Sequence, residues 1–146
     1  MKITICGSVA FAEEIVAAQE KLEAKGIETV VPNRIENYLG DTPLKQRVSG
    51  WSTIEGAQRK RERNLIKGYY EEIAKSDAIL VINQEKMGIK NYIGGNSFLE
   101  MGFAYILNKP IYLLNPIPDE LKIFYEEVVA MQPIILNGDL DSIPLL

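Results

Sequence analysis

The chain has 146 residues, of which 47% are hydrophobic and 25% are charged, and its formal net charge is -4. These values are typical of one ordinary globular domain, 1–146, and the acidic balance gives no general attraction to nucleic acid or anionic lipid. The sequence has no histidine and one cysteine, Cys6, which excludes Ser/His and Cys/His catalysis, histidine-rich metal sites and an intrachain disulfide. We therefore expect no metal ion and no cofactor.

The same features predict a cytoplasmic protein. A single cysteine in an apolar run suits a reducing compartment. The N-terminus enters directly into a strand pattern, without the basic and apolar regions of a signal peptide, and no apolar run approaches the ~18 residues of a membrane span. We expect no membrane partner.

The first thirty residues predict a strand, a helix and a second strand. Residues 2–6 form an apolar run typical of a buried strand, and Gly7 and Ser8 follow as a turn. Apolar side chains recur at helical spacing through residues 10–25, and residues 27–31 form a second apolar run. This order predicts two parallel strands joined by a right-handed crossover.

Residues 33–56 have no sustained period and are rich in Gly, Pro, Asn, Ser and Thr. The segment is too long for an ordinary connector, and it predicts either a mobile lid or an irregular excursion with a short helix. Its aromatic residues Tyr38 and Trp51 could stack on a base or pack the segment onto the domain, and packing is the favoured interpretation.

Residues 57–75 predict one helix with two different halves. The first half includes residues 59–63, four of which are basic, and is polar on all sides, whereas Tyr69 and Tyr70 belong to an apolar face of the second half. The basic group could bind phosphate or RNA. A solvated helix face is the favoured interpretation in an acidic protein, so no nucleic-acid partner is expected.

The second half of the chain adds three strands and two helices. Residues 77–83 form the strongest apolar run, which is typical of the centre of a parallel sheet. The elements that follow are a helix over 97–107, a strand over 111–114, a helix over 120–131, a strand over 134–136 and an apolar tail over 139–146 that can dock on the domain or on a second subunit. Together they predict an α/β fold, with a three-layer α/β/α domain and a five-stranded parallel sheet in the order 2-1-3-4-5.

The strongest functional signal lies in the turn after the central strand. Gly94 and Gly95 make this turn flexible, Asn96 or Ser97 can cap the following helix, and Glu100 is placed in the first helical turn. In a parallel sheet the turn reaches the carboxyl edge, where open α/β folds bind their ligands.

Two interpretations of Glu100 are open. Ser97-x-x-Glu100 fits a capping box, in which both side chains bond free N–H groups of the helix start. Alternatively, a carboxylate that faces the crevice can attack a sugar carbon as a nucleophile. The Gly-Gly turn and the position at the expected crevice favour the nucleophile.

Three segments resemble a known family. They are Ile-Cys-Gly-Ser at 5–8, Ser-Asp-Ala-Ile-Leu-Val at 76–81, and Gly-Asn-Ser-Phe-Leu-Glu-Met-Gly-Phe-Ala at 95–104 with Lys-Pro-Ile at 109–111. The chain resembles the nucleoside 2-deoxyribosyltransferase superfamily, which includes the deoxynucleoside 5'-monophosphate N-glycosidases, over most of residues 1–115. The resemblance implies a flavodoxin-like homodimer or larger homo-oligomer that cleaves the N-glycosidic bond of a nucleoside or nucleotide substrate.

Carried over to this chain, the resemblance implies that Glu100 attacks the anomeric carbon and forms a glycosyl-enzyme intermediate. It also implies that residues around the crevice contact the substrate. These residues are Cys6, Gly7, Ser8, Tyr69, Asn91, Gly94, Gly95, Asn96 and Ser97. Tyr92 is a further polar contact expected near the sugar, and loop and cap chemistry is an equally good explanation of Asn91, Tyr92 and Asn96.

The chain departs from the family pattern at three positions. Gly94 stands where the transferases have an aspartate, Tyr69 stands where alignment puts another, and Thr4 stands where a tyrosine is usual. The missing carboxylates favour hydrolysis over base exchange, and Tyr69 or Tyr70 could supply a phenol instead. They also favour an alternative function, a non-catalytic nucleotide-binding or sensing module on the same fold.

A fainter likeness concerns residues 94–100. Their Gly-Gly-Asn-Ser-x-x-Glu pattern is similar to the Gly-Gly-x-Gly-Thr-x-x-Glu motif of phosphoribohydrolases that release cytokinin bases, although it is one residue shorter and lacks the third glycine. Both families cleave a base from a sugar. The likeness therefore supports the reaction class more than any particular substrate.

Overall fold

The computed structural model describes residues 1–50 and 52–146 and contains a five-stranded parallel sheet in the order β2-β1-β3-β4-β5. The strands are β1 (Lys2–Cys6), β2 (Glu28–Val30), β3 (Ala78–Val81), β4 (Ile111–Leu113) and β5 (Ile134–Ile135). In the central register Ile3 pairs with Ala78, and Cys6 pairs with Val81. The predicted fold class and strand order are confirmed.

Helices cover both faces of this sheet. They are α1 (Ala12–Ala24), α2 (Thr42–Ser49), α3 (Ile54–Glu62), α4 (Leu65–Lys75), α5 (Gly95–Ile106) and α6 (Tyr125–Ala130). Successive side chains of a strand point to opposite faces, so Ile5 and Leu80 join a core beneath α1 whereas Cys6 and Val81 join a second core with α4, α5 and α6. The predicted three layers result from this alternation.

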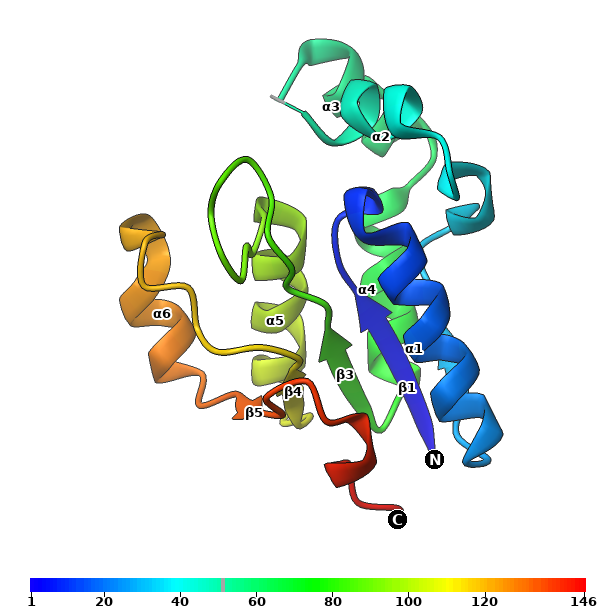
Figure 1. Ribbon diagram of the computed structural model, residues 1–146, viewed down its shortest axis with the longest axis vertical. Helices are drawn as coiled ribbons and strands as arrows, with labels where there is room; N and C mark the ends of the chain where they lie inside the picture. Colours follow the sequence, from blue (N-terminus) through cyan, green and yellow to red (C-terminus); the bar gives the residue numbers. More distant parts are fainter. Residues whose placement is uncertain (51) are drawn as a thin grey trace.

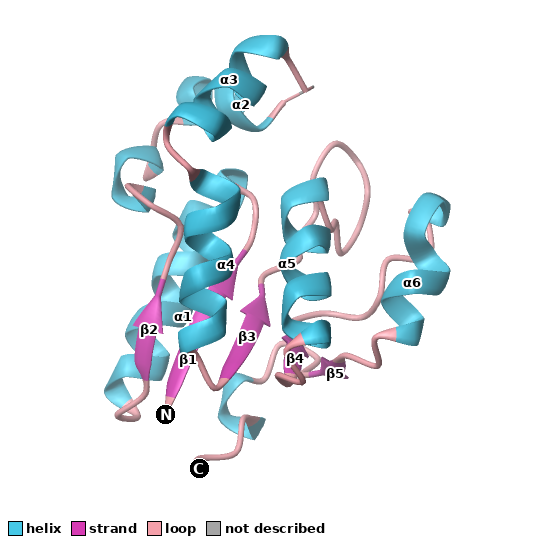
Figure 2. Ribbon diagram, turned by 180° about the vertical axis from the view of Figure 1, so that it is seen from behind, coloured by secondary structure: helices cyan, strands magenta, loops and turns pink. Residues whose placement is uncertain are grey.

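Segment 33–56 contains a 3-10 turn (Ile35–Tyr38), the helix α2 and the start of α3. Figures 1 and 2 show α2 and α3 beyond the end of the sheet to which the strands point, with both chain termini at the opposite end. Lys45 of α2 pairs with Glu13 of α1, which ties the segment to the domain. Tyr38 packs against the core beneath α1, as the favoured interpretation held, and Trp51 lies outside the described residues.

The prediction of a single helix over 57–75 is wrong at its centre. The helix α3 ends at Glu62, α4 begins at Leu65, and Asn64 between them has φ 52°. Asparagine tolerates this left-handed conformation better than most residues, and it interrupts the helical hydrogen-bond ladder. Because α3 buries no side chain, no packing holds it in line with α4, which buries Ile73.

Two further predictions concern the C-terminal part of the chain. The helix expected over 120–131 is a 3-10 turn (Lys122–Phe124) followed by the shorter α6. The tail docks on its own domain, because Leu140 and Ile143 are buried in the core beneath α1. Leu145 and Leu146 remain exposed.

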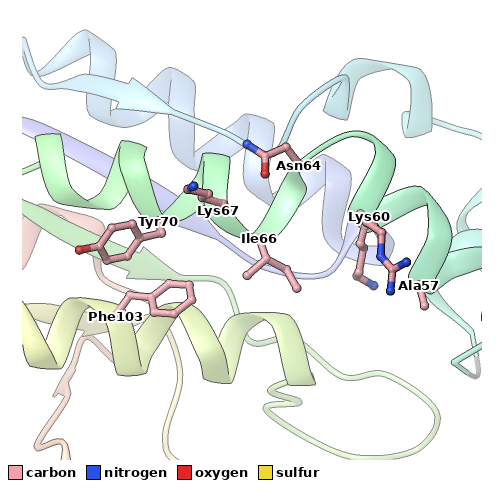
Figure 3. Close-up of a pocket in the computed structure, with 8 residues that line it drawn as sticks. Ala57, Lys60, Asn64, Ile66, Lys67, Tyr70 and Phe103 are labelled. Carbon is pink, nitrogen blue, oxygen red and sulfur yellow. The ribbon is translucent and has the colours of Figure 1, made fainter.

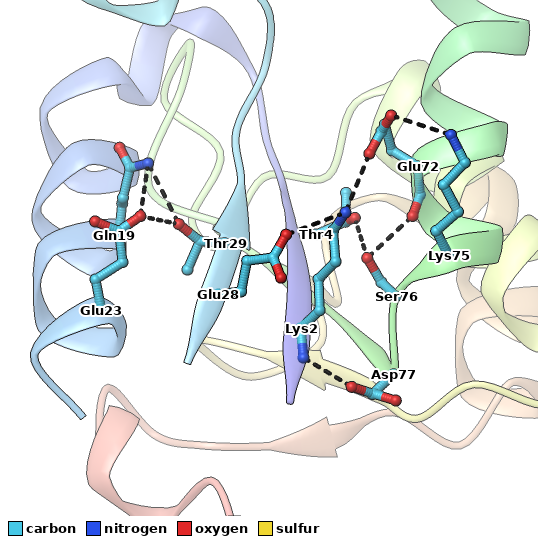
Figure 4. Close-up of polar contacts among 10 residues, drawn as sticks. All are labelled: Lys2, Thr4, Gln19, Glu23, Glu28, Thr29, Glu72, Lys75, Ser76 and Asp77. Atoms are coloured by element: carbon cyan, nitrogen blue, oxygen red, sulfur yellow. Dashed lines mark hydrogen bonds and ion pairs between the residues drawn. The ribbon is translucent and has the colours of Figure 1, made fainter. Parts of the chain in front are cut away.

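Polar contacts fasten the amino end of β1 to the chain before β3 (Figure 4). The Lys2 backbone N–H donates to Asp77 Oδ2 over 2.7 Å, so Asp77 has a structural role. Thr4 Oγ1 lies 2.7 Å from Ser76 Oγ, and Ser76 Oγ donates to the Glu72 carbonyl oxygen over 3.0 Å. Thr4 is therefore the donor to Ser76, and both side chains are buried.

Among the described residues, no helix has both the length and the apolar character needed to cross a membrane.

We predict that Ser76→Ala destabilises the protein more than Thr4→Val. Removing the Ser76 hydroxyl leaves that of Thr4 buried without a partner, which costs roughly 1–3 kcal/mol, whereas Ser76 keeps its bond to Glu72 when Thr4 is changed. Urea unfolding of both variants and of the double variant measures the difference. A larger loss of unfolding free energy in Thr4→Val would contradict the assigned direction of the hydrogen bond.

Candidate functional site

Glu100 is not part of a capping box. The helix α5 begins at Gly95, Gly94 occupies its N-cap position, and no side chain caps it. Ser97 therefore lies inside the first turn and Glu100 in the second, so the expectation that Asn96 or Ser97 caps the helix is wrong. The glycines cause the difference, because their backbone allows the helix to start before the polar residues.

The Glu100 side chain meets the end of β1. The Cys6 thiol and the Glu100 carboxyl group lie close enough to shift each other's pKa, while the thiol itself donates to the Thr4 carbonyl oxygen over 3.9 Å. Burial raises the pKa of Glu100 to about 8, and the Cys6 thiol opposes this rise. Glu100 as a residue keeps part of its surface accessible, whereas its carboxyl group is largely removed from water.

Tyr69 joins this group from α4. Burial raises its pKa well above the usual range, and the neighbouring Cys6 and Glu100 raise it further. Its hydroxyl donates to the Ile5 carbonyl oxygen. Of the predicted site residues, the structure thus brings Cys6, Tyr69 and Glu100 together from three different elements, and it directs the phenolic proton of Tyr69 toward the backbone.

Gly7 and Ser8 continue β1 beside the end of β3. A Cβ atom at Gly7 would lie 3.2 Å from the Ile82 carbonyl oxygen and 3.3 Å from Ile15 Cδ1, so the close passage of the chain here favours glycine. Ser8 Oγ accepts hydrogen bonds from the Ala10 N–H and from Lys86 Nζ, both over 3.2 Å.

The loop before α5 is held by two asparagines. The Asn115 N–H donates to Asn83 Oδ1 over 2.8 Å, and Asn83 Nδ2 donates to the Asn115 carbonyl oxygen over 3.0 Å. Asn83 is completely buried. Asn91, a predicted substrate contact, has φ 56°, a conformation that accounts for asparagine there without a ligand.

Tyr92 covers Gly94, the position at which the transferases that the sequence resembles have an aspartate. A Cβ atom at Gly94 would lie 3.3 Å from Tyr92 Cε1 and 3.7 Å from its hydroxyl oxygen. A longer side chain at Gly94 therefore requires movement of the tyrosine. Gly95 and Asn96 next to it are exposed, whereas Ser97 is buried.

The sequence patterns single out neither Asn83 nor Lys86. Asn83 appeared only as the end of a predicted strand, and Lys86 lies in a polar loop without any recognisable motif. Each has a role in the structure because of a hydrogen bond to a residue distant in the sequence: Asn83 bonds Asn115, and Lys86 bonds Ser8. The one signal in the sequence was an asparagine directly after a buried strand. It could have indicated a side chain that hydrogen-bonds neighbouring loops at this edge of the sheet.

A separate groove of about 580 Å³ is lined by α3 and α4, with Phe103 of α5 at one side (Figure 3). Tyr70 and Phe103 meet edge to face in it, with ring centres 5.4 Å apart. Its lining residues are Ala57, Lys60, Arg61, Asn64, Ile66, Lys67, Tyr70 and Phe103. Glu100 is not one of them, so this groove is distinct from the Glu100 cluster.

No protein-family model matches the sequence, and no curated protein matches it. A solved 2-deoxyribosyltransferase from the psychrotolerant bacterium Bacillus psychrosaccharolyticus is similar in structure, with a TM-score of 0.52 and 20% sequence identity. The match covers 92% of this chain and 98% of that chain. The chain shares the fold of a 2-deoxyribosyltransferase. This result agrees with the family resemblance in the sequence, and identity this low establishes the fold alone.

We predict that Glu100 makes stability fall as the pH rises from about 5 to about 8. The pKa of Glu100 is raised from 4.5 to about 8, so in this range the folded protein binds a proton that the unfolded chain has released. Glu100→Gln should remove this loss, which is roughly 3–4 kcal/mol. Urea unfolding at a series of pH values measures it.

The control for this experiment is Glu14→Gln, which changes an exposed glutamate of α1. It should keep the wild-type dependence of unfolding free energy on pH. An unchanged dependence in Glu100→Gln would show that the Glu100 carboxyl ionises as freely in the folded protein as in water.

Proposed function

We propose that the chain cleaves the N-glycosidic bond of a nucleoside or nucleoside 5'-monophosphate, with Glu100 as the nucleophile. The main support is one observation: a lone, desolvated carboxyl group lies at the carboxyl end of β1, beside Cys6. This is the edge at which open parallel sheets bind ligands. The fold shared with a 2-deoxyribosyltransferase adds support.

In the proposed reaction, a Glu100 carboxylate oxygen bonds to the anomeric carbon while the bond from that carbon to the base nitrogen breaks. The base leaves with the bonding electron pair and takes up a proton. Water then attacks the anomeric carbon of the glycosyl ester, restores the Glu100 carboxylate and completes hydrolysis. Since a desolvated carboxylate is poorly stabilised by water, burial favours its attack once it is ionised.

We further propose that hydrolysis, rather than base exchange, is the reaction. Tyr69 directs its proton to Ile5 and is poorly placed to serve the departing base. Tyr92 is the better phenol for this role, because its hydroxyl lies beside Gly94, at the turn where α5 begins. A phenol is a weaker acid than a carboxyl group, so a second base would be held and activated less well.

The alternative is a nucleotide-binding or sensing module without catalysis. It is favoured by the raised pKa of Glu100, which keeps most of this carboxyl group protonated at neutral pH. It is also favoured because this chain lacks the further carboxylates that the transferases it resembles carry. Binding without turnover is the result that would select this alternative.

We also propose that the protein is a cytoplasmic homodimer or larger homo-oligomer. The support is an apolar surface on α5 that includes the exposed side chains of Leu99, Tyr105 and Ile106. A groove of about 490 Å³ runs along this surface between α5 and α6. Exposed apolar surface of this kind is common at protein interfaces.

We predict that Glu100→Gln lowers the rate of base release by roughly a thousandfold or more, because the amide cannot form the glycosyl ester. The assay is chromatographic detection of free base from a panel of nucleosides and their 5'-monophosphates. Glu14→Gln is the control and should retain activity. If no compound yields base but some raise the thermal unfolding temperature, the binding module is correct instead.

We predict that kcat/KM for the best substrate rises with pH until about pH 8. Only the ionised form of Glu100 attacks, and its pKa is raised to about 8. The profile should be measured with an assay that detects the free base directly. A rate that is already constant above about pH 5 would contradict an attacking group with this pKa.

A further inference from the structure

The side-chain amide of Asn83 extends the hydrogen bonding of the sheet beyond the end of β3. The backbone ladder between β3 and β4 reaches the Leu114 N–H, which donates to the Val81 carbonyl oxygen over 3.0 Å. The next residue, Asn115, pairs with the Asn83 side chain instead: its N–H donates to Oδ1 over 2.8 Å, and its carbonyl oxygen accepts from Nδ2 over 3.0 Å. Asn115 Nδ2 donates in turn to the Asn83 carbonyl oxygen over 2.9 Å. The ends of the two strands are thereby fixed to each other.

The same amide closes the loop that leads to α5. Asn83 Nδ2 also lies 3.4 Å from the Asn91 carbonyl oxygen and 3.1 Å from that of Pro116, so three carbonyl oxygens converge on one NH₂ group. Beside it, the Tyr92 N–H donates to the Gln84 carbonyl oxygen over 2.9 Å. Asn83 is completely buried, and hydrogen bonds in such an interior are stronger than in water. The two ends of the loop are therefore held together directly before the tyrosine.

Tyr92 is the side chain that this closure places. It packs against the core beneath α1, whereas Ile93 is buried in the second core. Lys86 Nζ lies 5.0 Å from the centre of the tyrosine ring, and a Cβ atom at Gly94 would lie 3.7 Å from the hydroxyl oxygen. Because neighbours hold the ring, the place of the hydroxyl follows from the backbone position that the closed loop gives to Tyr92.

The transfer of a proton to a departing base depends steeply on this position. A general acid has to come within roughly 2.6–3.2 Å of the atom that it protonates, and a displacement of about 1 Å can cost roughly a hundredfold in rate. Tyr92 belongs to the loop, whereas Glu100 belongs to α5. The position of the acid relative to the nucleophile therefore depends on how the loop is closed.

We propose that Asn83 is a positioning residue, which acts through Tyr92 by holding the hydroxyl of this tyrosine where it gives its proton to the departing base. The inference rests on the proposed function, in which the base leaves with the electron pair of the broken bond. The tyrosinate that remains takes up a proton from the water that attacks the glycosyl ester, so both groups return to their starting states. Asn83 is buried and acts without contact to the substrate.

The first part of the test compares Asn83→Asp with the control Asn115→Ala. Aspartate has nearly the shape of asparagine but an oxygen in place of the NH₂ group, so the Asn91 carbonyl oxygen loses its donor. The control removes the Asn115 side-chain bond and leaves that donor in place. Urea unfolding should show that both variants fold and are destabilised. Amide hydrogen exchange at Tyr92 should be roughly tenfold faster or more in Asn83→Asp alone.

The second part is a double-mutant cycle with Tyr92→Phe, measured on the best substrate of the nucleoside and monophosphate panel. Tyr92→Phe should lower kcat roughly a hundredfold, and Asn83→Asp should lower it roughly tenfold or more with KM within about twofold of the wild type. Adding Asn83→Asp to Tyr92→Phe should lower kcat no further. Asn115→Ala should keep the wild-type kcat. If Asn83→Asp does not fold, Asn83→Ser gives the same comparison, since its short hydroxyl cannot reach all three carbonyl oxygens.

The outcomes separate this inference from the proposed function. If Asn83→Asp lowers kcat by the same factor with and without the Tyr92 hydroxyl, or leaves hydrogen exchange at Tyr92 unchanged, Asn83 is not a positioning residue although base is still released. Coupling of Asn83 and Tyr92 in an enzyme that stays active as Glu100→Gln would support the inference and overturn the Glu100 chemistry. Absence of base release from every compound would overturn both.

Discussion

The side-by-side ending of β1 and β3 is the constraint on which the site depends. Cys6 pairs with Val81, and Gly7 then passes so close to Ile82 that a side chain would meet its carbonyl oxygen at 3.2 Å. This packing fixes the direction in which the chain leaves each strand. It brings the Cys6 thiol to α5 and the Ser8 hydroxyl to Lys86, so one close backbone contact positions both.

Burial acts on the two charged groups of this site in opposite directions. It raises the pKa of the Glu100 carboxyl group and lowers that of the Lys86 ammonium, so the charged form of each group is less favoured here than in water. An anion beside Lys86 would favour the ammonium form, and positive charge that develops on a sugar beside Glu100 would favour the carboxylate. Each of these interactions would thus favour the charged form of the group beside it.

The sequence predicted features that follow from local periodicity. Continuous apolar runs that alternate with helical patterns were sufficient for the strand order, because parallel strands joined by right-handed helical crossovers form few sheet orders. The break at Asn64 and the start of α5 at Gly95 were not predictable in this way, since both depend on how a few residues use unusual or flexible backbone conformations. Lys86 was missed because its significance comes from Ser8, which is distant in the sequence.

The departures from the family pattern are consistent with an anionic substrate. Where the transferases that the sequence resembles have carboxylates, this chain has Gly94 and Tyr69, and the Tyr92 ring covers the glycine. Additional carboxylates near Glu100 would raise its pKa further and would repel a phosphate group. Neutral phenol and thiol groups avoid both effects while leaving the Cys6 thiol beside Glu100. The loss of acidic groups that weakens the case for base exchange therefore strengthens the case for a phosphorylated nucleoside.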